Sequence, residues 1–216
     1  MTDKPFFSVI LPAHNAAGYF RKQLDSIKSQ SFTDYELIVI ADKCSDNTAE
    51  VAREYTDKVL EVDFGKCGLS RNAGLDAARG EWILFADDDD WFLHDYVFES
   101  LYDILAGSEG DVLNCSFIWK HGDDNVYTPA FRSDSAYHMW VAPWCRAIRR
   151  EWLGDHRFPA WKHSDDLGFA EEMFPIMVGA KMAWWDAPIY YYNYMHEGSI
   201  QDKLRTGELS NDDMRE

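Results

Sequence analysis

Short apolar runs alternate with helical segments over the first half of the chain, and this alternation constrains the fold more than any other feature. Four runs have the length and composition of buried strands: residues 6–11, 35–42, 58–64 and 81–86. Each precedes a segment with helical spacing or helix-capping residues: 15–31, 45–55, 68–80 and 94–107. Strands that alternate with helices build a parallel sheet covered by helices, so the sequence predicts an α/β fold.

Within these segments, Asn15 is a candidate N-cap of the first helix, and Ser45 or Asp46 of the second. The second half of the chain is less regular. Its strand-like residues are 111–119, around 126–131 and 187–195, and its helical residues lie near 143–153 and 165–178. The polar tail, 201–216, predicts a frayed end or a loose helix. No linker separates the halves, so we predict a single domain spanning 1–216.

The formal net charge of -17 disfavours a broad basic surface for nucleic acid. An anionic small molecule would need a divalent cation, which carboxylates could hold. The four cysteines are widely spaced and include no C-x-x-C pair, so we expect free thiols. No window reaches the 18 or so apolar residues of a membrane span. These features together predict a soluble, cytoplasmic protein.

Four consecutive aspartates, Asp87–Asp90, follow the fourth apolar run in "WILFADDDDW". Ligands of open α/β sheets bind beyond the carboxyl ends of the strands, so the run stands where an active site is expected. An acidic run is usually a solvated loop, but this one lies between "WILFA" and "WF", at the edge of a core. Like charges there raise one another's pKa unless a cation or hydrogen-bond donors compensate. Bound Mg²⁺ or Mn²⁺ would relieve the repulsion and could bridge to phosphates.

Three kinds of site use clustered aspartates. A calcium loop needs a spaced D-x-D-x-D-G pattern with a closing Glu, which is absent. A HAD-like metal-dependent phosphohydrolase attacks phosphorus with the first Asp of a D-x-D, but normally carries it on the first strand. A nucleotide-sugar transferase uses D-x-D to hold a metal on a diphosphate. A catalytically inactive nucleotide-binding module is a further alternative.

Five segments carry a resemblance to a known family: "SVILPAHNAAGYFRKQLDSIKSQSFTDYELIVIAD", "KCSDNTAEVA", "GLSRNAGLDAARGEWILFADDDDW", "HSDDLGFAEEM" and "YYYNYMHEGSI". In this order they resemble motifs of the family 2 glycosyltransferases with the GT-A fold, over nearly the whole chain. The resemblance implies a Rossmann-like, mostly parallel central sheet flanked by helices, with a smaller C-terminal acceptor-side lobe. Residues 1–100 would form the nucleotide-sugar-binding half and residues 101–200 the acceptor-side half.

The chain departs from the family pattern at several positions near the expected site. His14 replaces the usual aromatic residue, Ala41 replaces the first Asp of a pair, and Lys43 and Cys44 replace Gly-Ser. The G-x-S-x-A-R-N segment is also shortened around "GLSRN". These departures bear on which base or sugar is recognised.

The resemblance implies donor contacts from several strand ends. Asp42 would accept a hydrogen bond from the base or ribose, although it could instead be a helix N-terminal charge. Arg71 and Asn72 would face the base and the diphosphate, although Arg71 could be a solvated helix residue. The full set of implied nucleotide-sugar contacts is Pro12, Ala13, Asn15, Asp42, Arg71, Asn72, Asp87 and Asp88.

By the same resemblance, Asp89 is the direct metal ligand, Asp87 or Asp88 lies nearer the ribose, and Asp90 caps the following segment. Asp87 and His196 would complete the shell around Mn²⁺ or Mg²⁺. Asp165 and Asp166 match the family's acidic pair. Asp166 would be the general base, with Asp165 as the alternative base or an extra metal ligand. The two could also be a helix N-cap pair.

An arginine-rich stretch, residues 144–163, stands out in an otherwise acidic chain. It allows either an exposed helix face that balances nearby carboxylates or an acceptor-side patch for something anionic. Its cations are Arg146, Arg149, Arg150, Arg157 and Lys162, and Trp140, Trp144, Trp152 and Trp161 lie nearby in the sequence. Stacking of a sugar or base on these tryptophans is chemically possible.

The resemblance thus implies an inverting, metal-dependent hexosyl- or pentosyltransferase. Its donor would be a nucleotide sugar, with a UDP-sugar expected first. The acceptor would be a hydroxyl group on a glycan or another polymer, with a modified nucleic-acid base as the lesser alternative.

Overall fold

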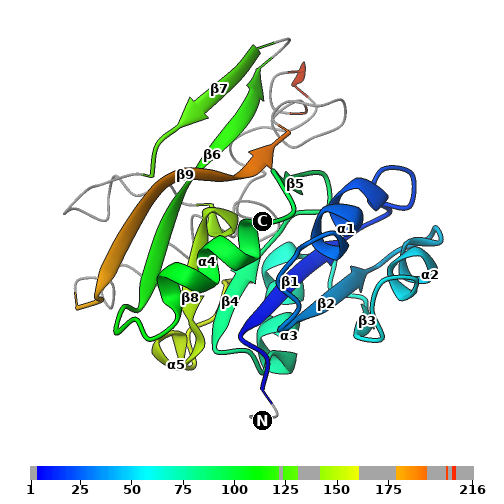
Figure 1. Ribbon diagram of the computed structural model, residues 1–216. Helices are drawn as coiled ribbons and strands as arrows, with labels where there is room; N and C mark the ends of the chain where they lie inside the picture. The colour runs from blue at the N-terminus through cyan, green and yellow to red at the C-terminus, as the bar shows by residue number, and fades with distance from the viewer. Residues whose placement is uncertain are drawn as a thin grey trace.

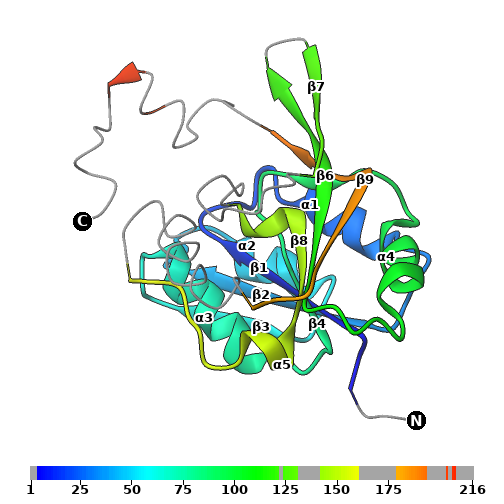
Figure 2. The ribbon, with the colours of Figure 1, turned by 90° about the vertical axis from the view of Figure 1, so that its left-hand side faces the viewer.

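The computed structural model describes residues 4–121, 124–130, 142–160 and 179–193, together with Lys203, Thr206 and Gly207. Over these residues the chain forms one mixed sheet, with strands in the order β3-β2-β1-β4-β8-β6-β9-β5 and with β7 paired to β6 (Figure 1). Helices cover both faces of the sheet (Figure 2). The predicted α/β fold is confirmed.

The first half of the chain builds the parallel part of the sheet. Strands β1, β2, β3 and β4 all run in the same direction, in the order β3-β2-β1-β4. They span Phe7–Ala13, Tyr35–Asp42, Val59–Val62 and Trp82–Phe85. The helices between and after them are α1 (Arg21–Lys28), α2 (Thr48–Arg53), α3 (Cys67–Ala77) and α4 (Val97–Leu105). The predicted alternation is therefore confirmed: β2 has the predicted bounds, β1 extends two residues further than predicted, and the other elements are shorter than their sequence segments.

The second half adds antiparallel neighbours. Strand β8 (Arg146–Arg149) lies antiparallel between β4 and β6 (Val112–His121). Strand β9 (Met182–Tyr192) is parallel to β6 and antiparallel to the short β5 (Trp91–Phe92). Strand β7 (Asp124–Thr128) pairs with the far end of β6. The helix predicted near 165–178 and most of the tail lie outside the described residues.

The helix predicted near 143–153 is wrong. That stretch forms a 3-10 turn, η2 (Pro143–Cys145), then β8, and only then a single helical turn, α5 (Arg150–Leu153). Ala147 pairs with Leu84 on one side and Leu113 on the other, so β8 fills a central position in the sheet. Burial between two strands outweighs the helical preference of the local sequence.

Asn15 is not a helix cap. Helix α1 begins only at Arg21, and Asn15 lies in the preceding loop with φ at 49°. At the start of α2, Asp46 Oδ1 accepts the backbone N–H of Thr48 at 3.1 Å, whereas Asn47 occupies the cap position. The loops after β1 and β2 are therefore longer than predicted.

Alternating residues of the parallel strands enter two separate cores. Val9 and Leu11 of β1 face a core that includes residues of α1, α2 and α4. Ile10 faces the other core, which includes residues of α3 and α5. Figure 2 shows α3 and α4 on opposite sides of the sheet. Burial on both faces explains why these strands read as continuous apolar runs.

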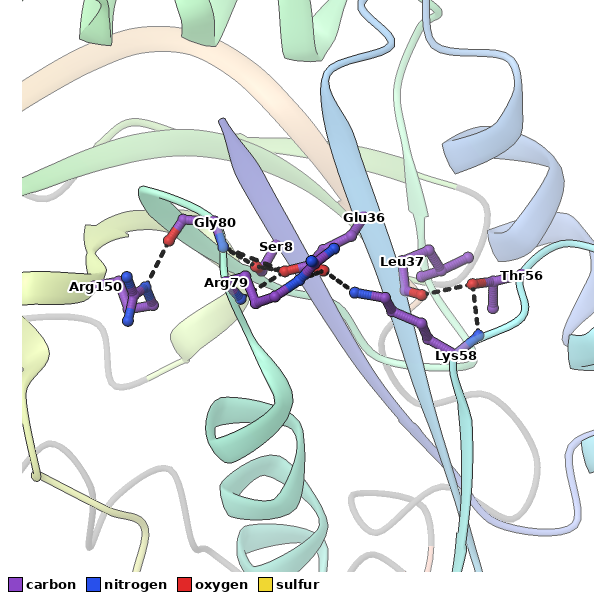
Figure 3. Close-up of polar contacts among 8 residues, drawn as sticks. All are labelled: Ser8, Glu36, Leu37, Thr56, Lys58, Arg79, Gly80 and Arg150. Carbon is purple, nitrogen blue, oxygen red and sulfur yellow. Dashed lines mark hydrogen bonds and ion pairs between the residues drawn. The ribbon is translucent and has the colours of Figure 1, made fainter. Parts of the chain in front are cut away.

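A buried carboxylate ties the amino ends of the strands together (Figure 3). Glu36 of β2 accepts hydrogen bonds from Ser8 Oγ at 2.5 Å and from the backbone N–H of Arg79 at 2.6 Å, and pairs with Lys58. Gly80 packs so closely here that a Cβ would lie 2.5 Å from the backbone nitrogen of Ser8. This network fixes the end of the sheet opposite the aspartate run.

Glu36→Gln is expected to lower the free energy of unfolding at pH 7. Burial raises the pKa of Glu36, but hydrogen bonds from Lys58, Ser8 and Arg79 outweigh it and lower the pKa from 4.5 to about 2. A shift of that size corresponds to about 3 kcal/mol. Because the folded pKa is depressed, this stability is present above the unfolded pKa and is lost as the pH falls toward the folded value.

Urea unfolding between pH 7 and pH 3 tests this expectation. The difference between wild type and Glu36→Gln should shrink as the pH falls. Glu54→Gln is the matched control, since Glu54 pairs with Arg21 on the surface. A pH-independent difference would contradict the assigned role of Glu36.

Candidate active site

Loops from the carboxyl ends of β1, β2 and β4 meet at His14. Its backbone N–H donates to Asp88 Oδ2 at 3.2 Å, and its Nδ1 lies 2.7 Å from the carbonyl oxygen of Asp42. A carbonyl only accepts, so Nδ1 carries the proton and Nε2 accepts from the Asn15 amide at 3.1 Å. The meeting point lies between β1 and β4, where the strand order reverses, and open α/β sheets bind ligands at such points.

The loops after β1 and β2 are also bonded directly to each other. Asn15 Oδ1 accepts the backbone N–H of Ser45 at 2.7 Å, and Thr48 Oγ1 accepts the backbone N–H of Ala16 at 2.7 Å. Pro12 and Ala13, two further predicted donor contacts, are the buried last residues of β1. These contacts fix the edge of the site nearest β2.

The carboxylate of Asp42 is fully engaged with the protein. Oδ1 accepts the backbone N–H groups of Phe64 and Gly65 at 2.8 and 2.9 Å. Oδ2 accepts the backbone N–H of Lys66 at 3.2 Å and the Ser70 hydroxyl at 2.8 Å. Asp42 therefore organises the start of α3, as its alternative interpretation holds, and its contact with a donor stays a prediction.

Arg71 contacts the aspartate run. Its side chain is 4% exposed, and Nη2 donates to Asp87 Oδ1 at 2.7 Å. The alternative of a solvated helix residue is therefore wrong. Asn72 instead pairs with the backbone of Phe158, donating to its carbonyl oxygen at 2.9 Å and accepting its N–H at 2.8 Å. The two neighbours predicted to act together thus have different contacts.

The four aspartates occupy different environments. Asp87 pairs with Arg71, and Asp88 accepts the N–H of His14. Asp90 is 1% exposed, and its Oδ1 accepts the backbone N–H of Asn193 at 2.8 Å. Asp90 therefore binds the chain just after β9. The prediction that it caps the following segment is wrong. Burial, together with the charge of Asp89, raises the pKa of both Asp88 and Asp90 well above the usual range.

Two residues that the sequence analysis did not single out, Tyr190 and Gln23, hold the backbone of the aspartate run at Asp87. The Tyr190 hydroxyl accepts the backbone N–H of Asp87 at 2.9 Å and the side-chain amide of Gln23 at 3.0 Å. Gln23 also donates to the carbonyl oxygen of Asp87 at 3.2 Å. Tyr190 lies 103 positions beyond Asp87, so no local pattern could have revealed this contact.

Tyr190→Phe is expected to lower the free energy of unfolding by about 1–3 kcal/mol, because it leaves the backbone N–H of Asp87 without its acceptor and removes one of the two acceptors of the Gln23 amide. Urea unfolding measures the loss. Tyr191→Phe is the matched control, because the Tyr191 hydroxyl donates to Asn125 at the exposed surface. Equal losses in the two variants would show that the hydroxyl of Tyr190 has no special role.

Carboxylate oxygens are the ligands that a hard divalent cation prefers. Burial and the charges of Asp89 and Asp87 raise the pKa of Asp88, so a bound cation would relieve the repulsion along the run. Among the described residues, however, no group of three His, Cys, Asp or Glu side chains is arranged to hold a metal ion. The remaining predicted site residues, His196, Asp165 and Asp166, lie outside the described residues.

Of the four described arginines of the 144–163 stretch, Arg146 is buried at the start of β8, beside the carboxyl end of β4, and its Nε donates to Asn114 Oδ1 at 3.0 Å. The other three lie away from the aspartate run. Arg149 pairs with Glu81 at 2.7 Å, and Arg150 donates to the carbonyl oxygen of Gly80 at 2.7 Å, at the amino end of β4. Arg157 pairs with Asp76 at 2.7 Å. Arg149 and Arg157 thus balance carboxylates, as one interpretation held, although Arg149 belongs to a strand. Lys162, Trp140 and Trp161 lie outside the described residues.

Comparison with known proteins identifies relatives of the chain. The profile of glycosyl transferase family 2 matches residues 8–163. The uncharacterized glycosyltransferase YibD of Escherichia coli is 27% identical over 225 residues, covering 93% of this chain and 64% of YibD. The chain thus spans less than two thirds of this relative.

Solved structures share the fold. TarS of Staphylococcus aureus, in complex with UDP-GlcNAc, has a TM-score of 0.77 and 24% identity, over 91% of this chain and 60% of that one. The mannosyltransferase PcManGT of Pyrobaculum calidifontis, in complex with GDP-Man and Mn²⁺, has a TM-score of 0.70 and 16% identity, over 96% and 62%. The mostly parallel sheet is therefore a GT-A fold. No helix in the described ranges is long and apolar enough to cross a membrane.

Proposed function

Because the chain belongs to glycosyl transferase family 2, we propose that it transfers a sugar from a nucleotide-sugar donor to a hydroxyl acceptor with inversion at the anomeric carbon. The observation that carries this proposal is the aspartate run, held beside Arg71 at the point where the strand order reverses. We infer a UDP-sugar as the donor, since TarS was solved with UDP-GlcNAc, and a GDP-sugar as the second candidate, since PcManGT was solved with GDP-Man.

Asp89, with Asp87, would hold Mn²⁺ or Mg²⁺, and His196 would complete the set. Bound there, the cation supplies positive charge to the diphosphate as it leaves. Arg71 orients Asp87 through their ion pair. Asp88, held by the N–H of His14, would face the ribose. In this proposal Asp89 and Asp87 bind the metal, whereas Asp90 has a structural role, since it holds the chain after β9 through the N–H of Asn193.

The chemical step needs a base on the acceptor side. Asp166 would take the proton of the acceptor hydroxyl as its oxygen attacks the anomeric carbon. The new carbon–oxygen bond forms opposite the bond to the diphosphate, which breaks, so the configuration inverts. Asp165 is the alternative base or an additional metal ligand. The acceptor we propose is a hydroxyl group on a glycan or another polymer.

The proposal also assigns the two substrates to different halves of the chain. Residues 1–100 would bind the nucleotide sugar and residues 101–200 the acceptor. All four cysteines are free, as expected, and a cytoplasmic location remains a prediction.

Incubation with UDP- and GDP-sugars plus Mn²⁺ tests the proposed function. A transferase should slowly release nucleoside diphosphate even without its acceptor, and EDTA should stop the release. Phosphate release from monoesters would instead favour the phosphohydrolase. Nucleotide binding without turnover of any donor, with or without candidate acceptors, would favour the inactive module.

A further inference from the structure

Lys43 has a backbone conformation that lysine rarely adopts. Its φ is 53°, and among the described residues Asn15 is the only other non-glycine residue with positive φ. Asparagine tolerates this region, whereas lysine does so at a cost. The N–H of Lys43 donates to the carbonyl oxygen of Val62 at 2.7 Å, which fixes the bend after β2. Strain of this kind is concentrated at functional sites, so the lysine side chain needs an explanation.

The side chain of Lys43 lies across the loop that leads into α3. A Cβ added to Gly65 would lie 3.4 Å from Lys43 Cδ and 3.7 Å from Nζ, which places the end of the lysine side chain in van der Waals reach of this loop. Lys43 is exposed, and no described side chain pairs with its ammonium group. The carboxylate of Asp42 next to it already accepts four hydrogen bonds from other groups.

Lys43 lies where the base and ribose of a nucleotide would reach if its diphosphate were bound at the aspartate run. Strand β2 is separated from β4 by β1 alone, so the ends of β2 and β4 lie about 10 Å apart. A nucleotide with its diphosphate at Asp87–Asp89 would extend its ribose and base over such a distance toward β2. The same loop as Gly65 carries Phe64, a residue that is 44% exposed. A free ammonium group and an exposed ring suit a base or ribose.

We propose that Lys43 binds the nucleoside half of the donor, and that the strained backbone at residue 43 is retained for this contact. Its ammonium group donates a hydrogen bond to an oxygen of the base or ribose. The proposal rests on the proposed function, since it takes a nucleotide as the ligand. It adds a donor contact at a position where the family pattern has glycine.

Titration of UDP in the presence of Mn²⁺ tests the proposal with two variants. Lys43→Met removes the ammonium group but keeps the strain, so the Kd for UDP should rise about tenfold while the Tm stays the same. Lys43→Gly removes both, so the Kd should rise equally while the Tm increases by about 2–4 °C. Lys28→Met is the matched control, because Lys28 is an exposed lysine at the end of α1, and it should bind UDP like the wild type.

The outcomes separate this proposal from the function on which it rests. If the wild type binds UDP and Lys43→Met binds it equally well, the contact does not exist. If Lys28→Met loses as much affinity as Lys43→Met, the effect is one of overall charge and the proposal is wrong. If the wild type binds neither UDP nor GDP with Mn²⁺, the proposed function itself fails, and this proposal with it.

Discussion

Asp89→Ala is expected to abolish Mn²⁺-dependent binding of UDP, raising the Kd by more than about 100-fold. Loss of a residue that merely supports a metal ligand typically costs 10–100-fold, so loss of the ligand itself should cost more. The fold should be retained, because the charge of Asp89 raises the pKa of Asp88 and Asp90 and its removal relieves repulsion. Calorimetric titration with UDP and Mn²⁺, together with thermal unfolding, measures both effects.

The matched control for this variant is Asp34→Ala. Asp34 is an exposed aspartate just before β2, at the end of the sheet opposite the aspartate run. It should bind UDP like the wild type, although its net charge changes by the same amount. UDP binding by Asp89→Ala at wild-type strength would show that Asp89 is not the metal ligand.

Asp166→Asn should leave UDP binding unchanged and lower turnover by about 10²–10⁴-fold, the usual contribution of a general base. The amide has nearly the same shape as the carboxylate but cannot take the proton of the acceptor hydroxyl. Transfer rates at saturating donor and titration with UDP separate the two effects. Asp165→Asn is the comparison, and it should keep more activity. Full transfer activity in Asp166→Asn would move the base to another residue.

Much of the fold was predictable because the strands of a doubly covered sheet have a plain signature. β1, β2 and β4 are buried on both faces and appear as short apolar runs. Strand β8 has no such signature, because it is four residues long and begins and ends with arginine. Its place between β4 and β6 depends on partners about 35 and 65 positions away, which local periodicity does not detect.

The site was predictable only in part. The position of the aspartates at the end of β4 followed from the strand pattern, whereas the ion pair of Arg71 with Asp87 was not predicted. The hydrogen bonds of Asp42, by contrast, depend on how the loop before α3 folds back over β2. The contacts of Asp87 with Tyr190 and of Asp90 with Asn193 join residues 103 positions apart, and only the sheet brings them together.

The measurement that tests the account most directly is a crystal structure of the chain with UDP and Mn²⁺. We expect Mn²⁺ bound to a carboxylate oxygen of Asp89 and to the diphosphate, with the nucleoside extending over the carboxyl end of β2. A nucleotide bound elsewhere, or a diphosphate bound away from the aspartate run, would contradict the account.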